Sequence, residues 1–568
     1  MSETALVLDG HSRAALETLQ SLGRRRIAVD VASEGACLAF RSRYCRRRIA
    51  QPPPGDPDAF LRWLEAIDAE HPYRLLVPST ETSLRSLIRL PESHPLRRRA
   101  VLPSTHSLEI ALSKQSTWEA ARSQGVSVPG SRVLTARPSR VDPESLPLIL
   151  KPDVSLVTVG DRSMVLRPII ARTVQEWERA LNRLLPLGSV LEQEFVPGGG
   201  VGIECLYRDG SCAWHFQHER VHELPLTGGG SSYRRSAPAD AVLLSEATRL
   251  LDSLAWHGVA MVEFKGSAEQ GFRLMEINPR LWGSLALAIG AGVDFPYGLW
   301  SIAGETTPGP QPNYRSPYYA RNLEMDVEWL KENLRADRSN PLLLTRPRFR
   351  SLVEYGRPLL GVERWDHFDL GDWRVWSRVL RGALSRVIKP AMALAANKVR
   401  LHSLGAHHRS VLAKLCTGRK APRVLFLCYG NICRSPLAEL YARKVAPDLE
   451  VASAGFHETT GRTAPGWFQA ITLELGVDVS ESRSKRVSDA QVAWADLVLL
   501  ADLENLDRFK REFPDAVHKA TMLGLFLPTP SPSLKDPYNL GPDEARSAAR
   551  GVVTAAEGVV AWSRTLTA

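Results

Sequence analysis

The chain has 568 residues, which is too long for a single domain with one hydrophobic core. Its composition, 44% hydrophobic and 24% charged residues, is typical of globular proteins. The seven cysteines show no paired CxxC spacing, which argues against a zinc site or a disulfide framework. The start, MSETALVLDG, lacks the pattern of a signal peptide, and no uncharged apolar run reaches the roughly 18–20 residues of a membrane span. We therefore expect several domains and a cytoplasmic protein.

The net charge of +10 is concentrated in one segment. Residues 373–423 contain twelve Lys or Arg and no acidic residue, so the rest of the chain is near −2. A protein that grips nucleic acid more often spreads basic residues over a recognition domain with interleaved aromatics. We therefore expect no nucleic-acid partner.

Residues 1–105 are predicted to form a small parallel α/β lobe. ALVLDG, an alanine- and leucine-rich helix and RRRIAVDVAS indicate strand, helix and strand, and YRLLVPS and AVLPS add two strand-like runs. LDGHSR lacks the three-glycine dinucleotide fingerprint, so we favour a structural lobe over an NAD site.

Residues 106–335 contain a candidate metal site. MVEFKGSAEQGFRLMEINPRLWGS predicts a hairpin of two strands, on which Glu263 and Glu276 lie across the turn from each other and Asn278 shares the strand parity of Glu276. Two carboxylates and an amide oxygen suit Mg²⁺, with room for nucleotide phosphates. Taken alone, such residues are more often a solvated face.

The order of elements from about Leu6 to Trp300 resembles the ATP-grasp superfamily, especially its carboxylate–amine ligases, and MEINPRLWGSLALAIGAGVDFP is the most specific part of the resemblance. In such enzymes ATP converts a small carboxylate into an acyl phosphate, which an amine then attacks. The residue roles that the resemblance implies are nucleotide contacts for Lys114 and Lys151, an adenine hinge at Glu194, Phe195 and Val196, Mg²⁺ ligation by Glu263, Glu276 and Asn278, and a substrate or intermediate contact for Arg280.

This region departs from the family pattern in three places. The loop after Lys151 is PDVSLVTVGDRS rather than glycine- and serine-rich, only glycines stand near Gly199 where an acidic residue is expected, and Met261 stands where many relatives have arginine. These departures keep an alternative open: a nucleotide- or metabolite-binding domain that ligates nothing and regulates the rest of the chain. TGGGSSYRRS, residues 227–236, is predicted either to close over phosphates through its backbone amides or to be a flexible surface loop.

Residues 336–420 are predicted to be a C-terminal extension and a basic helical linker. In residues 373–389 the apolar side chains Trp373, Trp376, Leu380, Leu384, Val387 and Ile388 share one helical face. Peripheral contact of 373–420 with an anionic membrane is one interpretation. We favour the other, a helix that packs on the preceding domain and leads onward.

Residues 421–568 begin with VLFLCYGNICRSPLAE, which predicts a buried strand, a tight loop and a helix. The strand is expected to end at Cys428, with Ser435 as N-cap and Pro436 at the first helical position. Backbone N–H groups and a helix N-terminus then converge on one point, which is an anion site that favours a thiolate. Arg434 is placed to clamp phosphate oxygens, and Ser435 to donate to the sulfur.

CYGNICRSPLAE resembles the signature of low-molecular-weight protein tyrosine phosphatases, and SAGF, SESRSKRV, ADLVLLADLENL and KDPYNLG extend the resemblance to the C-terminus. The roles that it implies are a nucleophile, Cys428; a clamp, Arg434; a sulfur donor, Ser435; a general acid and base, Asp536; a phosphate-binding loop of Tyr429, Gly430, Asn431, Ile432 and Cys433, braced by Asn431; and a stacking residue, Tyr538.

Three finer questions arise within this fold. Nothing after Cys433 is cysteine, which argues against an arsenate reductase. Arginine phosphatases of this fold carry threonine where this chain has Ile432, so phosphotyrosine is the better prediction. Cys433 either traps Cys428 as a reversible disulfide or packs the loop, and both interpretations stay open.

Together these expectations describe an α/β multidomain, bifunctional enzyme. An ATP-grasp part, built of a small parallel lobe and two α+β subdomains, uses ATP and Mg²⁺ on small carboxylate and amine substrates. A phosphatase domain with a central parallel sheet flanked by helices needs no cofactor and hydrolyses a phosphotyrosine protein or a small phosphomonoester.

Overall fold

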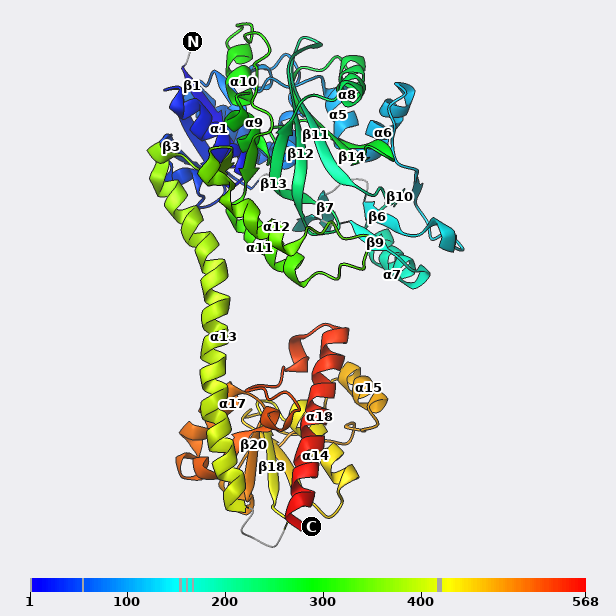
Figure 1. The fold of residues 1–568 in the computed structure, drawn as a ribbon, viewed down its shortest axis with the longest axis vertical. Coiled ribbons are helices and arrows are strands. Elements are labelled where there is room, and N and C mark those ends of the chain that lie inside the picture. The colour runs from blue at the N-terminus through cyan, green and yellow to red at the C-terminus, as the bar shows by residue number, and fades with distance from the viewer. Residues whose placement is uncertain are drawn as a thin grey trace. The chain divides into compact units, whose positions relative to one another are not determined.

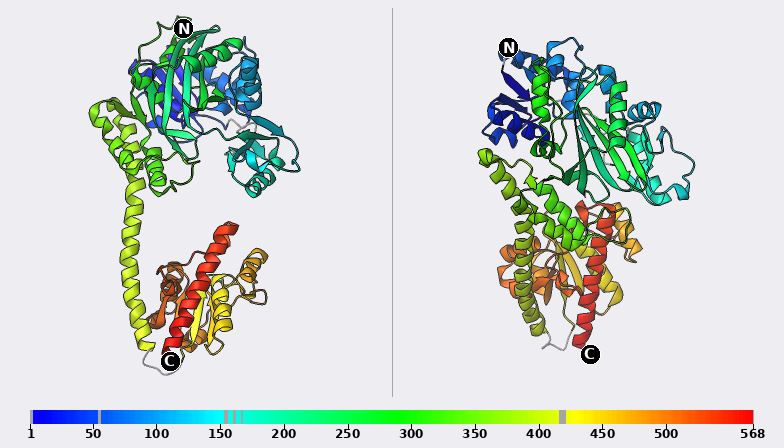
Figure 2. Two further views of the ribbon diagram at one scale, coloured as in Figure 1. Left: turned by 45° about the vertical axis from the view of Figure 1, so that its right-hand side comes forward. Right: turned by 45° about the horizontal axis from the view of Figure 1, so that its top comes forward.

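The computed structural model describes residues 3–53, 56–152, 156–159, 162–165, 168–415 and 421–567. The chain divides into two compact units, Met1–Val387 and Ile388–Ala568, which are described separately (Figures 1 and 2). In the described part of the chain, no single helix has the length and apolarity to cross a membrane, although the bent pair Leu285–Ala291 and Phe295–Ala303 meets both criteria together. Most side chains of that pair are buried in the core of the first unit.

The first unit begins with a four-stranded parallel sheet of order β3-β2-β1-β4, as the sequence predicts. Ala5 and Val7 pack towards α1, whereas Leu6 packs on the other face with Phe60 and Leu64 of α2. This alternation is the period of two expected of strands covered on both faces. The elements are β1 (Thr4–Val7), α1 (Arg13–Arg24), β2 (Ala28–Ser33), β3 (Cys45–Ala50), α2 (Pro57–Glu70), β4 (Leu75–Val77), α3 (Glu81–Leu87) and α4 (Pro95–Arg99).

A smaller antiparallel sheet of order β5-β10-β6-β9 follows, covered by α7. Trp177 of α7 is buried, and its indole N–H donates to Glu192 of β10 at 2.6 Å. The elements are α5 (Thr105–Leu112), α6 (Lys114–Ser123), β5 (Ser131–Leu134), β6 (Leu148–Pro152), β7 (Leu156–Val159), β8 (Arg162–Val165), β9 (Ile169–Ala171), α7 (Val174–Leu184) and β10 (Val190–Glu194).

The largest element of the first unit is a seven-stranded sheet of order β15-β14-β11-β12-β13-β16-β17. Ala260, Val262 and Phe264 of β14 pack with α8 on one face, while Val259 and Met261 face the core shared with α9 and α10. The bounds are β11 (Gly199–Arg208), β12 (Ser211–Leu224), β13 (Gly230–Ala237), α8 (Ala241–Ser253), β14 (Gly258–Ser267), β15 (Gly271–Asn278), α9 (Leu285–Ala291), α10 (Phe295–Ala303), β16 (Tyr319–Arg321), α11 (Leu323–Arg335), α12 (Arg348–Val353), the 3-10 helix η4 (Glu354–Leu360) and β17 (Glu363–Trp365).

Residues 228–231 line the same cavity as Lys114, Lys151 and Glu263, so the predicted closure of this segment over phosphates stays a prediction. The other prediction, a flexible surface loop, is wrong for most of the segment 227–236. From Gly230 onward it is strand β13, paired with β12 and β16, and Tyr233 and Arg234 are fully buried. The serines and the tyrosine of this segment are compatible with a half-buried strand as well as with a loop. Pairing with a neighbouring strand on each side makes the segment a strand.

The long helix α13 (Trp373–Leu415) also differs from expectation. Within the first unit its buried residues are Val375, Val379 and Ala383, whereas Trp373 is 62% and Leu384 48% exposed. The predicted apolar face is therefore only partly right, because Trp376 does pack on Trp365 and Phe368 of the first unit. Apolar residues occur around most of this helix, so periodicity alone did not select the side that packs.

The second unit contains a four-stranded parallel sheet of order β19-β18-β20-β21. Helices α14 and α18 contribute to one core cluster, and α17 to the other, so helices flank the sheet as predicted (Figure 1). The bounds are β18 (Val424–Cys428), α14 (Arg434–Val445), β19 (Val451–Gly455), α15 (Gly466–Glu474), α16 (Asp489–Trp494), β20 (Leu497–Leu500), α17 (Leu503–Glu512), β21 (Ala520–Met522) and α18 (Pro542–Thr567).

Candidate active sites

A cavity of about 430 Å³ in the first unit gathers most of the residues predicted for ATP and metal. It opens over the β14–β15 hairpin and reaches the start of α6 and strand β6. Its lining includes all six of the predicted residues Lys114, Lys151, Glu263, Glu276, Asn278 and Arg280. Side chains that are up to 166 positions apart in the sequence therefore converge on one cavity.

The predicted metal ligands are neighbours across the hairpin. Glu263 pairs directly with Glu276 in the strand register, and the Asn278 amide donates to Glu276 at 3.0 Å and to Glu263 at 3.3 Å. Burial raises the pKa of Glu263; Arg220 opposes this rise and the Glu276 carboxylate adds to it. For Glu276, burial is outweighed by Lys114, Asn278 and further cations, so its pKa is lowered.

This donor set fits Mg²⁺ with a nucleotide. Two half-buried carboxylates held side by side repel each other, and a divalent cation among their oxygens would remove that cost. Across the described residues, no group of three or more His, Cys, Asp or Glu is arranged to hold a metal, so the prediction rests on two glutamates and one asparagine.

The cavity carries a positive excess suited to phosphates. Six cationic side chains line it, against three carboxylates: Arg13, Lys114, Lys151, Arg220, Lys265 and Arg280 against Glu223, Glu263 and Glu276. The ammonium of Lys151 lies 5.1 Å from the ring centre of Trp118 in α6. Much of the loop that follows Lys151 lies outside the described residues.

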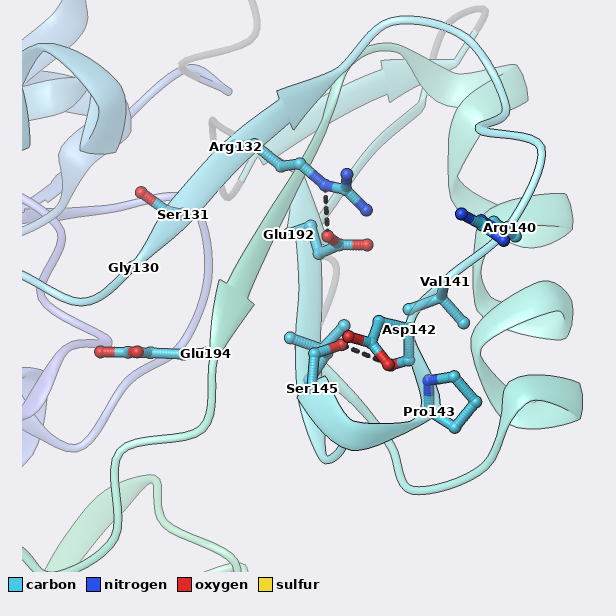
Figure 3. Close-up of a pocket in the computed structure, with 11 residues that line it drawn as sticks. Gly130, Ser131, Arg132, Arg140, Val141, Asp142, Pro143, Ser145, Glu192 and Glu194 are labelled. Carbon is cyan, nitrogen blue, oxygen red and sulfur yellow. Dashed lines mark hydrogen bonds and ion pairs between the residues drawn. The ribbon is translucent and has the colours of Figure 1, made fainter.

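The predicted hinge residues lie partly elsewhere. The side chain of Glu194 lines a separate cavity of about 720 Å³ and lies beside Gly130 (Figure 3). In that cavity Arg132 pairs with Glu192 at 2.5 Å. Val196 is buried, and the ring of Phe195 lies 5.2 Å from the ammonium of Lys265, which lines the 430 Å³ cavity. The predicted contact of the hinge backbone with adenine stays a prediction.

In the second unit, Cys428 ends β18 and is buried at the base of the loop that follows. The backbone N–H of Asn431 donates to its sulfur at 3.2 Å, and the Ser435 hydroxyl lies 3.0 Å from it. Ser435 is not the N-cap: α14 begins at Arg434 with Cys433 at that position. The Ser435 hydroxyl is engaged by Cys428, Asn431 and the Ala454 carbonyl, so it is not used for capping.

Asn431 holds the loop in a left-handed backbone conformation, with φ of 49°. Its side-chain amide donates to the hydroxyls of Ser435 and Ser453, both at 2.9 Å, and its oxygen accepts from the Lys485 backbone at 2.8 Å. Gly455 makes this approach feasible, because a Cβ there would lie 2.7 Å from the Tyr429 carbonyl oxygen. The SAGF and SESRSKRV segments thus support the loop from behind.

Arg434 is 3% exposed and links two carboxylates. One guanidinium nitrogen donates to Asp502 and the other to Asp536, both at 2.6 Å. Asp502 also caps α17 by accepting from the Asn505 backbone at 2.8 Å. Burial lowers the pKa of Arg434, but the Cys428, Asp536 and Asp502 charges outweigh burial and the pKa is raised. The guanidinium therefore stays charged.

These groups border a pocket of about 560 Å³. Tyr429 forms its aromatic wall, with the Arg508 guanidinium 4.8 Å from the ring centre. Tyr538, predicted to stack on substrate, is 53% exposed and is not among the described residues that line the pocket.

Residues 423–561 match the family model described as low molecular weight phosphotyrosine protein phosphatase. A protein-arginine-phosphatase of Geobacillus stearothermophilus is 34% identical over 129 residues, which are 22% of this chain and 86% of the relative. Through this domain the chain belongs to the low molecular weight phosphotyrosine protein phosphatase family. A probable low molecular weight protein-tyrosine-phosphatase EpsP of Ralstonia nicotianae is 32% identical over 101 residues, 18% of this chain and 70% of that relative.

Residues 189–329 match the family model described as ATP-grasp in the biosynthetic pathway with Ter operon, which confirms the ATP-grasp prediction for this region. An L-amino acid ligase from Bacillus licheniformis is 13% identical, with a TM-score of 0.41, over 53% of this chain and 74% of that protein.

Several residues of both sites had no role predicted from the sequence. In the phosphatase domain these are Asp502 and Arg508, although the segment ADLVLLADLENL that contains Asp502 was recognised as similar to the family. In the ATP-grasp region a residue without a predicted role is Arg220, which reaches Glu263 from strand β12. Arg220 follows three other polar residues, in the run QHER, and a charged residue in such a run is usually solvated, so the sequence gives no sign that Arg220 faces the cavity.

Proposed function

We propose that the phosphatase domain hydrolyses phosphotyrosine-type phosphomonoesters through a phosphocysteine. The pairing of Arg434, which directly follows the Cys428 loop, with Asp502 and Asp536 carries this proposal. The substrate phosphate replaces Asp536 as the partner of Arg434, which frees Asp536 to be protonated. The Cys428 thiolate attacks phosphorus, and the bond to the leaving oxygen breaks as protonated Asp536 gives that oxygen its proton. Asp536 then takes a proton from water, which attacks phosphorus and releases Cys428 as a thiolate that Ser435 and the Asn431 N–H stabilise.

Phosphoarginine is the second candidate substrate, because one relative is named a protein-arginine-phosphatase. The Tyr429 wall favours an aromatic phosphoester, as does Ile432 in place of the threonine expected of arginine phosphatases. The test is kcat/KM for matched phosphotyrosine and phosphoarginine peptides, measured on the wild type and on Ile432→Thr. A wild type that prefers phosphoarginine would overturn our assignment, and a gain of phosphoarginine activity in Ile432→Thr would explain the relative's specificity.

We propose that the ATP-grasp region ligates a small carboxylate to an amine. When bound, Mg²⁺-ATP would supply the phosphoryl group that activates the carboxylate. Glu263, Glu276 and Asn278 would hold the metal, and Lys114 and Lys151 would neutralise phosphate charge. Arg280 lines the same cavity and suits a substrate carboxylate through its planar fork.

The ligase assay uses Cys428→Ser, in which phosphatase turnover is silent. This variant is incubated with Mg²⁺-ATP and pools of amino acids and small carboxylic acids, and ADP is quantified. Substrate-dependent ADP that disappears in Glu276→Gln supports ligation. Nucleotide binding without substrate-dependent ADP supports the alternative, a nucleotide-binding domain that regulates the phosphatase.

We also retain peripheral membrane contact as a proposal, on a surface of α13 that differs from the predicted one. Trp373 and Leu384 are exposed, and Arg374, Arg378 and Arg381 are exposed beside them. These arginines recur at the i, i+4 and i+7 spacing of one helical face. Basic side chains next to exposed apolar ones suit an anionic lipid surface.

A further inference from the structure

A second basic cavity, of about 210 Å³, has none of the predicted metal ligands in its described lining and has no role in the functions proposed above. Strands β12, β13 and β16, the helix α12, the 3-10 helix η4 and the segment before α12 enclose it. We call it the arginine pocket, and its described lining is Glu219, Arg220, Val221, Arg235, Tyr319, Arg346, Arg350, Glu354 and Arg357.

The charges of the arginine pocket do not balance. Five guanidinium groups face two carboxylates among the lining residues. Two of the five are paired, Arg235 with Glu219 and Arg220 with Glu263 of the ATP-grasp cavity. The other three, Arg346, Arg350 and Arg357, face the single carboxylate of Glu354, which also lies 3.0 Å from the buried imidazole of His222. Concentrating like charges in a partly desolvated site is costly, and a bound anion offsets that cost.

The environment of Arg346 reflects this crowding of positive charges. Burial lowers its pKa; Glu354 opposes this, while Arg350, Arg235 and Arg357 lower it further. Its guanidinium reaches the Val221 carbonyl only at 3.5 Å, the limit of a hydrogen bond. The group therefore retains donors for an incoming acceptor.

Several of the arginines are fixed in place. Arg357 donates to the Tyr233 hydroxyl at 2.7 Å and lies 4.3 Å from the ring centre of Tyr319. Arg220 donates to the Gly229 carbonyl at 2.9 Å and to Glu263 of the ATP-grasp cavity. Arg350, in contrast, is 61% exposed at the mouth and lies 3.6 Å from Glu354. Pre-positioned donors bind a ligand with less loss of side-chain entropy.

We propose that the arginine pocket binds a phosphorylated small molecule. Guanidinium forks from two strands and from the α12–η4 segment approach from different sides, which suits a tetrahedral phosphoryl group better than a planar carboxylate. Because Arg220 lines both cavities, the bound phosphoryl group competes with Glu263 for this guanidinium. Occupancy of the arginine pocket is therefore coupled to the ATP-grasp cavity.

Equilibrium dialysis of the full chain with radiolabelled orthophosphate tests the proposal. The double variant Arg346→Gln/Arg350→Gln should bind one phosphate fewer per chain than the wild type, or bind that phosphate at least tenfold more weakly. The matched control is Arg348→Gln, an exposed arginine of the same helix that does not line the pocket. None of the three substituted arginines lines the phosphatase pocket or the ATP-grasp cavity, so both sites keep their own phosphate contacts in all three proteins.

Equal phosphate binding by the double variant and by Arg348→Gln would overturn the proposal. If the double variant fails to fold, Arg350→Gln alone serves, because this side chain is largely exposed; we then expect at least threefold weaker binding at one site, and no change would again overturn the proposal. Pyrophosphate should displace the label from this site. Displacement by citrate but not by pyrophosphate would overturn the assignment to a phosphorylated ligand.

Discussion

Arg220 on strand β12 donates a hydrogen bond to Glu263 on strand β14, across the intervening strand β11. This contact places a guanidinium beside the predicted metal ligands, in a chain that has Met261 where many ATP-grasp ligases have arginine. The coulombic effect of Glu263 and of further carboxylates outweighs burial and raises the pKa of Arg220. We infer that Arg220 supplies the positive charge that Met261 lacks.

Arg220→Met should weaken Mg²⁺-ADP binding about tenfold or more, because a charge-assisted contact is worth roughly 1.5–3 kcal/mol. Isothermal titration calorimetry at fixed Mg²⁺ measures the effect. Arg273→Met is the control, since Arg273 lies on strand β15 of the same sheet and does not line the cavity. Equal weakening by both substitutions would refute a specific role for Arg220.

Gly455→Ala should lower phosphatase kcat/KM at least tenfold. The added Cβ would lie 2.7 Å from the Tyr429 carbonyl oxygen and 2.9 Å from the Asn431 nitrogen, so the phosphate-binding loop has to shift. Hydrolysis of p-nitrophenyl phosphate provides the measurement, with circular dichroism to check folding. Gly466→Ala is the matched control, because a Cβ at that position meets no atom within 4 Å. Full activity of the Gly455 variant would contradict this account of the loop.

The parts of each site that could be predicted are those whose residues lie close together in the sequence. The Cys428–Ser435 loop and the Glu263–Glu276 hairpin are local patterns, and strand register alone brings the two glutamates together. The N-cap at Cys433 was missed, because the contacts that engage Ser435 come partly from Ala454 on another strand.

Residues contributed by distant strands could not be predicted in the same way. Arg220 reaches Glu263 across 43 sequence positions, and Arg434 reaches Asp536 across 102. The motif around Asp536 was recognised through family resemblance, whereas the segment around Arg220 has no such motif. The buried side of α13 was predicted only at Trp376, since tertiary packing also selected Val375 and Val379 from a helix with apolar residues on most sides.

Glu17→Gln should destabilise the first unit at neutral pH and have less effect in acid. Burial raises the pKa of Glu17, but Arg364 and the hydrogen bond with His367 outweigh burial and lower the pKa from 4.5 to about 2. A depressed carboxyl pKa contributes stability above pH 4.5 that is lost as pH falls towards 2, and this shift corresponds to about 3 kcal/mol.

Thermal unfolding of wild type and Glu17→Gln between pH 7 and pH 3 measures the Glu17 contribution. We expect the difference in midpoint to narrow once the pH falls below 4.5. A difference that stays constant across this range would show that Glu17 contributes through packing and not through its charge.

Removing the exposed basic face of α13 should weaken binding to anionic membranes. Each basic side chain near such a surface contributes about 1 kcal/mol, so Arg374→Gln/Arg378→Gln/Arg381→Gln should reduce binding to phosphatidylserine vesicles by about two orders of magnitude. Sedimentation with vesicles at low salt measures this, and binding should fall as salt screens the charges. The control removes three exposed arginines elsewhere, Arg172, Arg179 and Arg183, with the same change in net charge. Equal loss in both variants would indicate attraction by net charge alone, and no binding by the wild type would rule out the membrane proposal.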